Sequence, residues 1–169
     1  ISTLTKSEGG RPCKLLEISD KNGKGKKQVW FTARAHSGEV TGSFVLEGIV
    51  RNILADPKIL QKADFYFVPF VDTDGVWLGY YGKNREPRDF NRDYCLDPIR
   101  PEIDAILKAV RSKSSGRVDY SFDLHAPTPG DPVYLVPPKL SIISEDEWKE
   151  FCKFAATLEE FSPESCPAT

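Results

Sequence analysis

The sequence has no methionine, only two histidines and no CxxC pair among its four cysteines (Cys13, Cys95, Cys152 and Cys166). Scattered cysteines are typical of free thiols in a reducing compartment, so we expect a cytoplasmic protein, with two disulfides as the alternative. Because no apolar run has membrane-spanning length and no signal-peptide pattern opens the chain, we expect no membrane partner. The chain begins at Ile1, and we therefore expect a processed or partial chain.

The charge of the 169 residues is nearly balanced. A formal net charge of -2 provides no general attraction to nucleic acid. The lysine cluster Lys24, Lys26 and Lys27 has no interleaved aromatic residues, so we interpret it as a solvated loop tip. An apolar content of 40% over this length predicts one domain with a real core.

Strand and helix patterns alternate along the chain. Apolar segments that start at Val29, Asp64 and Val118 indicate three strands, separated by helical periodicities at 45–54 and 101–112. This alternation predicts an α/β fold. Residues 1–28 are expected to form an entry hairpin that turns at Asn22-Gly23, and residues 72–98 to form one long functional loop.

Both histidines stand where a predicted strand ends. His36 and Glu39 occupy the polar turn between the first apolar strand and its helix, and His125 follows the strand that begins at Val118. In an open α/β sheet, ligands bind outside the carboxyl ends of the strands. Imidazole nitrogen and carboxylate oxygen are zinc ligands, and three protein ligands are the number that a catalytic zinc takes. We therefore predict a zinc site formed by His36, Glu39 and His125.

The long loop carries a second candidate site near its end. Asn91 and Arg92 are suited to a carboxylate, because a guanidinium donates two parallel hydrogen bonds and an amide adds one. The alternative is a solvated charged loop.

Four short motifs occur in order: His36-Ser37-Gly38-Glu39, Asp74-Gly75, Asp89-Phe90-Asn91-Arg92 and Asp123-Leu124-His125-Ala126. Together they resemble the M14 family of zinc carboxypeptidases, closest to its cytosolic-carboxypeptidase-like branch, over residues 10 to 137. The resemblance implies a mixed, mostly parallel central sheet flanked by helices on both faces. It also implies one zinc ion held by His36, Glu39 and His125, a grip on the substrate α-carboxylate by Asn91 and Arg92, and an Asp89 that hydrogen-bonds the first metal histidine.

Two departures from the family pattern concern catalysis. The arginine that steadies the oxyanion in the family aligns with Gly82, and we expect Arg88 or Lys83 to replace it. The general-base glutamate and a substrate-covering tyrosine lie in the family well beyond the last zinc histidine. We therefore expect residues 1–169 to be a single metallocarboxypeptidase-like catalytic domain that lacks the C-terminal part with the general base. The glutamates of the last helical segment are poor candidates for this base: Glu145, Glu147, Glu150, Glu159 and Glu160.

The expected function is zinc-dependent hydrolysis of the C-terminal peptide bond of a peptide or protein with a free carboxylate. The alternatives are a zinc-dependent deacylase of N-acyl amino acids and a non-catalytic carboxylate-binding module of the same fold. A purely structural zinc is disfavoured, because structural sites usually have four protein ligands, often thiolates.

Overall fold

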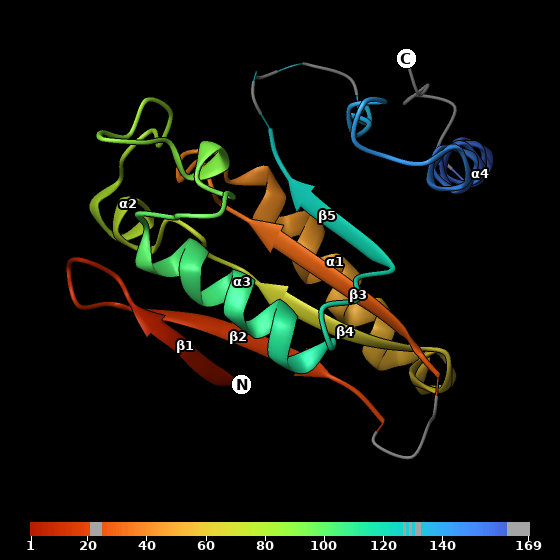
Figure 1. Ribbon diagram of the computed structural model, residues 1–169. Helices are drawn as coiled ribbons and strands as arrows, with labels where there is room; N and C mark the ends of the chain where they lie inside the picture. The colour runs from red at the N-terminus through yellow and green to blue at the C-terminus, as the bar shows by residue number, and fades with distance from the viewer. Residues whose placement is uncertain (21–24, 127, 129, 131–132, 162–169) are drawn as a thin grey trace. The chain divides into compact units, whose positions relative to one another are not determined.

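A computed structural model describes residues 1–20, 25–126, 128, 130 and 133–161 of the chain. They belong to two compact units, 1–126 and 127–169. The first unit is built on a five-stranded sheet with the order β1-β2-β4-β3-β5 (Figure 1). Its strands are β1 (Ser2–Lys6), β2 (Pro12–Ile18), β3 (Lys27–Ala33), β4 (Ala63–Val68) and β5 (Tyr120–Leu124).

The sheet is mixed, as the family resemblance implied. Strand β3 pairs in parallel with both β4 and β5, whereas β2 is antiparallel to β1 and to β4. In this register Phe31 lies opposite both Phe67 and Phe122, and its ring stacks on each at a centroid distance of 5.0 Å. Parallel pairing places the carboxyl ends of β3, β4 and β5 at one edge of the sheet.

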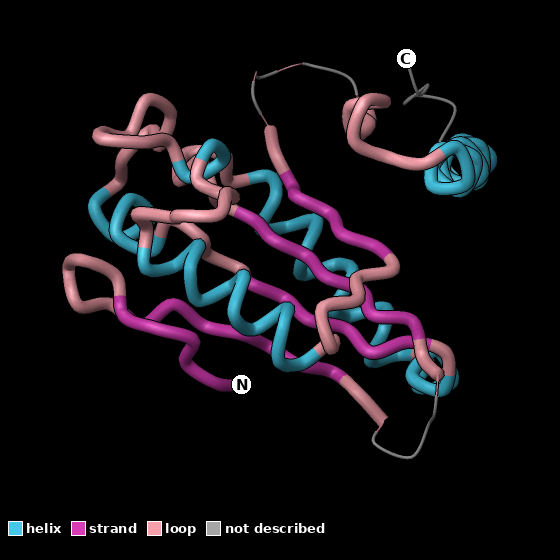
Figure 2. Tube along the Cα trace, viewed as in Figure 1, coloured by secondary structure: helices cyan, strands magenta, loops and turns pink. Residues whose placement is uncertain are grey.

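A helix covers each face of the sheet (Figure 2). Helix α1 (Thr41–Ala55) packs Leu46 and Ile53 against one face, and helix α3 (Pro101–Lys113) packs Ile103 and Ile106 against the other. The prediction of helices on both faces is therefore confirmed. A 3-10 turn, η1 (Pro57–Gln61), follows α1 and leads into β4.

The predicted long loop at 72–98 contains more regular structure than expected. It includes helix α2 (Thr73–Leu78) and the 3-10 turn η2 (Phe90–Arg92). The carboxylate of Asp72 accepts a hydrogen bond from the Gly75 N–H at the start of α2, and Gly79 ends the helix in a left-handed conformation. These capping signals were present in the sequence.

Residues 1–28 contain an antiparallel hairpin as predicted, but β1 and β2 form it, and it turns at residues 7–11 instead of at Asn22-Gly23. The strand that precedes Asn22-Gly23, β2, pairs with β1 and β4, and β3 lies on the far side of β4. Asn22, Gly23 and Lys24 themselves lie outside the described residues. Lys26 is buried, contrary to the prediction of a solvated loop tip. It is 7% exposed, and its ammonium pairs with Asp64 at 3.2 Å.

The second unit contains helix α4 (Glu145–Phe161), whose first turn has the predicted capping box between Ser144 and Glu147. None of the helices among the described residues combines the length and apolarity needed to cross a bilayer.

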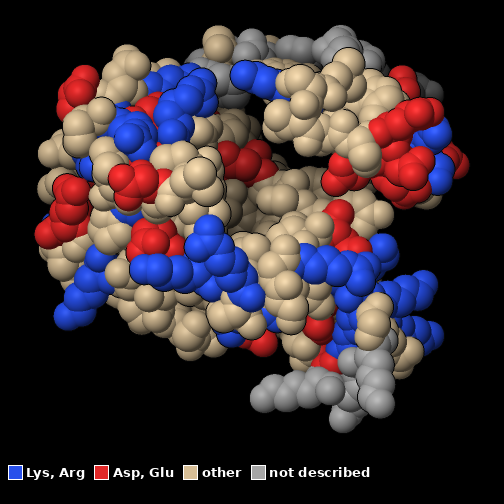
Figure 3. Space-filling model, in the orientation of Figure 1, with Lys and Arg blue, Asp and Glu red and all other residues tan. Residues whose placement is uncertain are grey.

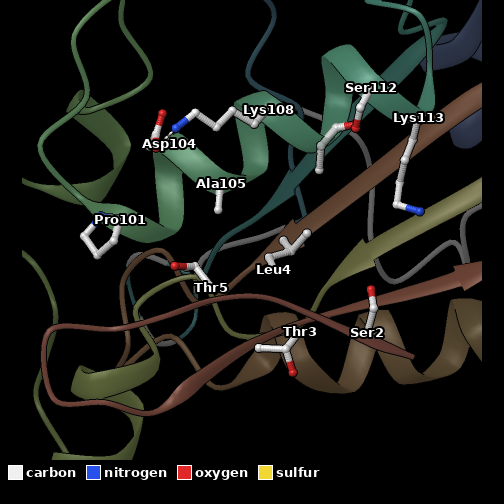
Figure 4. A pocket seen from close by; sticks show the side chains of 11 residues that line it. Ser2, Thr3, Leu4, Thr5, Pro101, Asp104, Ala105, Lys108, Ser112 and Lys113 are labelled. Carbon is white, nitrogen blue, oxygen red and sulfur yellow. Dashed lines mark hydrogen bonds and ion pairs between the residues drawn. The ribbon is translucent and has the colours of Figure 1, made fainter.

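On the visible face of the first unit, basic and acidic side chains are interspersed (Figure 3). A shallow groove between β1 and α3 is lined mainly by polar side chains, including the Lys108–Asp104 pair (Figure 4).

Candidate metal centre

The structure brings His36, Glu39 and His125 together. His36 and Glu39 lie in the turn after β3, and His125 directly follows β5, which is the parallel neighbour of β3. One donor atom from each residue lies within 4.8 Å of the other two. Adjacent parallel strands thus supply all three predicted ligands from the same edge of the sheet.

The two imidazole rings are oriented alike around Glu39. The Nδ1 atoms of His36 and His125 lie 3.0 Å and 2.7 Å from the two carboxylate oxygens of Glu39. Their Nε2 atoms face outward to other carboxylates, Asp89 at 3.2 Å and Asp123 at 2.7 Å. Carboxylates in this outer position hold a metal-binding histidine in one orientation and make its other nitrogen more basic.

Electrostatics keep this cluster charged. Burial alone would raise the pKa of Glu39, but hydrogen bonds from the Ala126 N–H, His125 and His36 outweigh burial and lower it to about 2. Burial likewise lowers the pKa of His125, but Asp123 and Glu39 outweigh it and raise the pKa to about 9. Because a metal binds neutral imidazole, metal binding at this site would release a proton from His125.

The loop that carries His36 and Glu39 is held by the backbone of residues 80–82. The Gly38 N–H donates to the Tyr81 carbonyl at 2.8 Å, and the Ser37 hydroxyl donates to the Tyr80 carbonyl. Gly82 has φ +95°, and a Cβ there would lie 2.2 Å from the Ser37 nitrogen. Position 82, where the family pattern has an arginine, therefore has no room for a side chain.

The two cations expected near the metal have different surroundings. The Lys83 ammonium lies 3.3 Å from Glu39 Oε1 and 5.4 Å from the Tyr81 ring centroid. Hydrogen bonding to Tyr81 and the proximity of Glu39 raise the pKa of Lys83. Arg88 instead pairs at 2.7 Å with the fully buried carboxylate of Asp93. Of the two, the structure brings Lys83 to the cluster.

Asn91 and Arg92 lie in η2, beside the metal cluster. Asp89 caps this turn by accepting the Asn91 N–H at 2.7 Å, so the residue that contacts His36 also sets the start of η2. The Asn91 amide lies 2.9 Å from His125 Nε2, whereas the Arg92 side chain is exposed to solvent. An exposed guanidinium on the same turn as Asn91 is available to bind an anion.

Comparison with known proteins agrees with this geometry. The model of the Peptidase_M14 family, zinc carboxypeptidase, matches residues 1–137. The chain belongs to the zinc carboxypeptidase family. This family uses zinc, and His36, Glu39 and His125 are a donor set that fits it.

The relatives of this family member are longer proteins. Cytosolic carboxypeptidase 2 of Xenopus tropicalis is 36% identical over 103 residues, which is 56% of this chain and 11% of the relative. Cytosolic carboxypeptidase 6 of Mus musculus is 34% identical over 137 residues, 73% of this chain and 25% of the relative. A metallo-carboxypeptidase from Burkholderia cenocepacia matches at a TM-score of 0.85 with 27% identity, covering 96% of this chain and 46% of its own.

Sequence reasoning missed the role of Asp123 in this family member. Asp123 lies two residues before His125, so on an extended strand both side chains project to the same side. Its carboxylate contacts His125 Nε2 and also accepts a hydrogen bond from the Thr32 hydroxyl at 2.7 Å. The Asp-x-His spacing at a strand end was the signal available in the sequence.

Proposed function

We propose that this zinc carboxypeptidase family member binds one zinc ion through His36, Glu39 and His125 and acts on the C-terminal peptide bond of a peptide or protein. The observation that supports it best is the arrangement around Glu39, where two histidines present Nδ1 inward and contact carboxylates through Nε2. This arrangement suits a metal whose ligands are two imidazoles and one carboxylate. The names of the relatives support the cytoplasmic location expected from the cysteines.

Recognition of the substrate carboxylate falls to Asn91 and Arg92. Arg92 offers the planar pair of N–H donors that fits a carboxylate, and Asn91 is held within reach of His125. This contact would place the free carboxylate of a substrate close to the metal. The partner is then a peptide or protein with a free C-terminus.

The chemistry depends on groups with separate tasks. When bound, zinc polarises a carbonyl and lowers the pKa of a water molecule. Glu39 is assigned to the metal, while Asp89 and Asp123 are engaged with the outward nitrogens of the histidines. These three described carboxylates therefore have other roles than accepting the proton of the water, and the proposal assigns that proton to none of them.

The experiment compares zinc binding and ligand binding in the same protein. We expect the purified chain to take up one zinc per molecule by mass spectrometry, and the variants His36→Ala and His125→Ala to take up none. Calorimetry on the zinc-loaded chain should show that a short peptide with a free C-terminus binds at least about tenfold more tightly than its C-terminal amide.

The variant Arg92→Met should abolish the preference for the free carboxylate while leaving zinc content unchanged. Equal binding of peptide and amide by the wild-type chain would contradict the proposed carboxylate grip. A wild-type chain that takes up no zinc would contradict the proposed function altogether. Tighter binding of N-acetyl amino acids than of peptides would favour the deacylase alternative.

A further inference from the structure

A buried ion pair lies next to the metal loop, which is formed by residues 36–39 and carries His36 and Glu39. We propose that the two members of this pair, Asp72 and Arg85, are positioning residues that hold the metal loop in the shape needed for metal binding. They act through Ser37, the residue between the two ligands of the loop. This inference rests on the proposed function, because it takes the three predicted residues as metal ligands.

Asp72 is fully buried and has a different partner at each carboxylate oxygen. Its Oδ1 atom accepts the Gly75 N–H at 2.8 Å, and its Oδ2 atom lies 3.5 Å from Arg85 Nε. Within the described part of the chain, neither Oδ2 nor Nε has a hydrogen-bond partner, so each depends on the charge of the other. A Cβ on Gly75 would clash with both Oδ2 and the Ser37 hydroxyl, which shows that Asp72 and Ser37 are neighbours.

The ion pair and the metal loop form a closed ring of contacts. Ser37 is 1% exposed, and its hydroxyl donates to the Tyr80 carbonyl at 3.0 Å. The Arg85 guanidinium lies over the Tyr80 ring, 4.8 Å from its centroid, and pairs with Asp72. Asp72 in turn lies beside Ser37. The ring therefore connects the metal loop to residues 80–85 through one hydroxyl and one ion pair.

The position of the Ser37 proton depends on this ion pair. Burial raises the pKa of Asp72, whereas Arg85 favours the charged carboxylate. A buried carboxylate without its cation is strongly unfavourable, and in the absence of Arg85 the nearest donor is the Ser37 hydroxyl. A hydroxyl has a single proton to donate. Loss of Arg85 should therefore draw Ser37 away from the Tyr80 carbonyl and change the shape of the metal loop.

A second ion pair of the same kind provides the matched control. Arg11 pairs with Asp74 at 2.8 Å and lies over the Trp77 ring, 5.3 Å from its centroid. This arginine thus contacts an aspartate and an aromatic ring of the α2 region, as Arg85 does, but it belongs to the β1–β2 turn. Arg11→Met removes the same type of side chain without touching the ring around Ser37.

Zinc affinity is measured by competition with a chelator on the whole chain. Arg85→Met should bind zinc about tenfold more weakly than the wild-type chain, whereas Arg11→Met should stay within about twofold. The double variant Asp72→Asn/Arg85→Met should return to within about threefold of wild type, because a neutral amide leaves no uncompensated charge. The d–d spectrum of bound cobalt(II), which reports ligand geometry, should change in Arg85→Met and not in Arg11→Met.

Hydrogen exchange in the zinc-free chain tests the same link without a metal. The Gly38 N–H donates to the Tyr81 carbonyl at 2.8 Å, so its exchange rate reports whether the metal loop is held. We expect exchange at least about tenfold faster in Arg85→Met under conditions where the protein stays folded, and unchanged exchange in Arg11→Met. Arg85→Lys keeps the charge and should exchange within about threefold of wild type.

The outcomes separate this inference from the proposed function. Weaker zinc binding and faster Gly38 exchange in Arg85→Met, both recovered in the double variant, support the positioning role. If wild type binds zinc and peptide while Arg85→Met behaves as Arg11→Met does, the inference is wrong and the proposed function stands. A double variant that binds zinc more weakly than Arg85→Met also overturns the inference, because the two side chains then act separately.

A folding defect does not remove the test. If Arg85→Met does not fold, the smaller change Arg85→Gln carries the same expectation, and a Gly38 amide as protected as in Arg11→Met overturns the inference. A wild-type chain without zinc would overturn the proposed function and the inference together.

Discussion

Both ends of the three parallel strands β3, β4 and β5 carry buried or half-buried carboxylates, but the partners of these carboxylates differ between the two ends. At the amino ends of β3, β4 and β5, the carboxylates of Asp64 and Asp119 are surrounded by lysine, arginine and neutral donors. At the carboxyl ends, the carboxylates of Glu39, Asp89 and Asp123 surround two histidines. The carboxylates of the first arrangement are paired with cations and hydrogen-bond donors of the protein itself. The second arrangement brings together imidazoles and carboxylates, which suit a metal ion as ligands.

The amino-end network shows what purely structural pairing looks like in this fold. Asp119 accepts the Gln28 N–H at 2.9 Å and pairs with Lys27 at 3.0 Å and with Arg117 at 2.7 Å. Burial alone would raise its pKa, but these partners outweigh burial and lower it to about 2. The partners of Asp119 are permanent cations and a backbone amide, and neither kind of group binds metal.

The carboxyl-end cluster reaches a similar pKa by different means. Glu39 also has a pKa of about 2, but two of the partners that lower it are imidazoles. An imidazole can exchange its proton for a metal ion, which a lysine or arginine cannot do under ordinary conditions. A low carboxylate pKa therefore does not distinguish a metal site from a structural ion pair; the identity of the partners does.

Replacing Glu39 should have the largest effect on zinc affinity. Glu39→Gln keeps the shape but removes the charge that both histidines face, so zinc affinity should fall more than about 100-fold. Chelator competition at constant pH measures the change. Retention of wild-type zinc affinity by Glu39→Gln would show that Glu39 is not a ligand.

The outer carboxylates should have a smaller effect of the same kind. Asp123→Asn removes the negative charge that faces His125 Nε2, and we expect zinc affinity to fall about 10- to 100-fold. Asp89→Asn should act similarly through His36. As the matched control, Asp64→Asn at the amino end should leave zinc affinity as it is, and a loss there equal to that in Asp123→Asn would refute the proposed role of the outer carboxylates.

Replacing Asp119 should affect the stability of the protein and not zinc binding. Because its folded pKa is lowered to about 2, its contribution is fully present above the ordinary aspartate value near 4 and is lost as the pH falls through 2. The cations beside it are largely exposed, so we expect Asp119→Asn to cost about 1 to 2 kcal/mol at pH 7. Urea unfolding at pH 7 and at pH 2 measures it; an equal cost at both pH values would contradict the assignment.

Local patterns in the sequence predicted much of this fold. The apolar runs at β3, β4 and β5 and the periodicities of α1 and α3 were recognisable because each depends on side chains within one segment. Helix α2 was overlooked in the loop at 72–98, although its Asp72 cap and Gly79 terminus were visible. Pairing was less predictable, since the Asn-Gly signal favoured a turn of the entry hairpin at Asn22-Gly23, whereas the hairpin of residues 1–28 joins β1 to β2.

Local patterns were enough to predict that His36 and His125 follow strands and that Glu39 lies three residues after His36, because strand ends and short spacings are local properties. The pairing of β5 with β3, which brings His125 to Glu39 across 86 positions of the chain, depends on tertiary contacts. Tertiary contacts likewise bring Lys83 to Glu39 and Arg88 to the buried Asp93, and the close contact of Gly82 with Ser37 precedes Lys83 in the chain. Contacts between distant segments set these positions, and no local pattern encodes them.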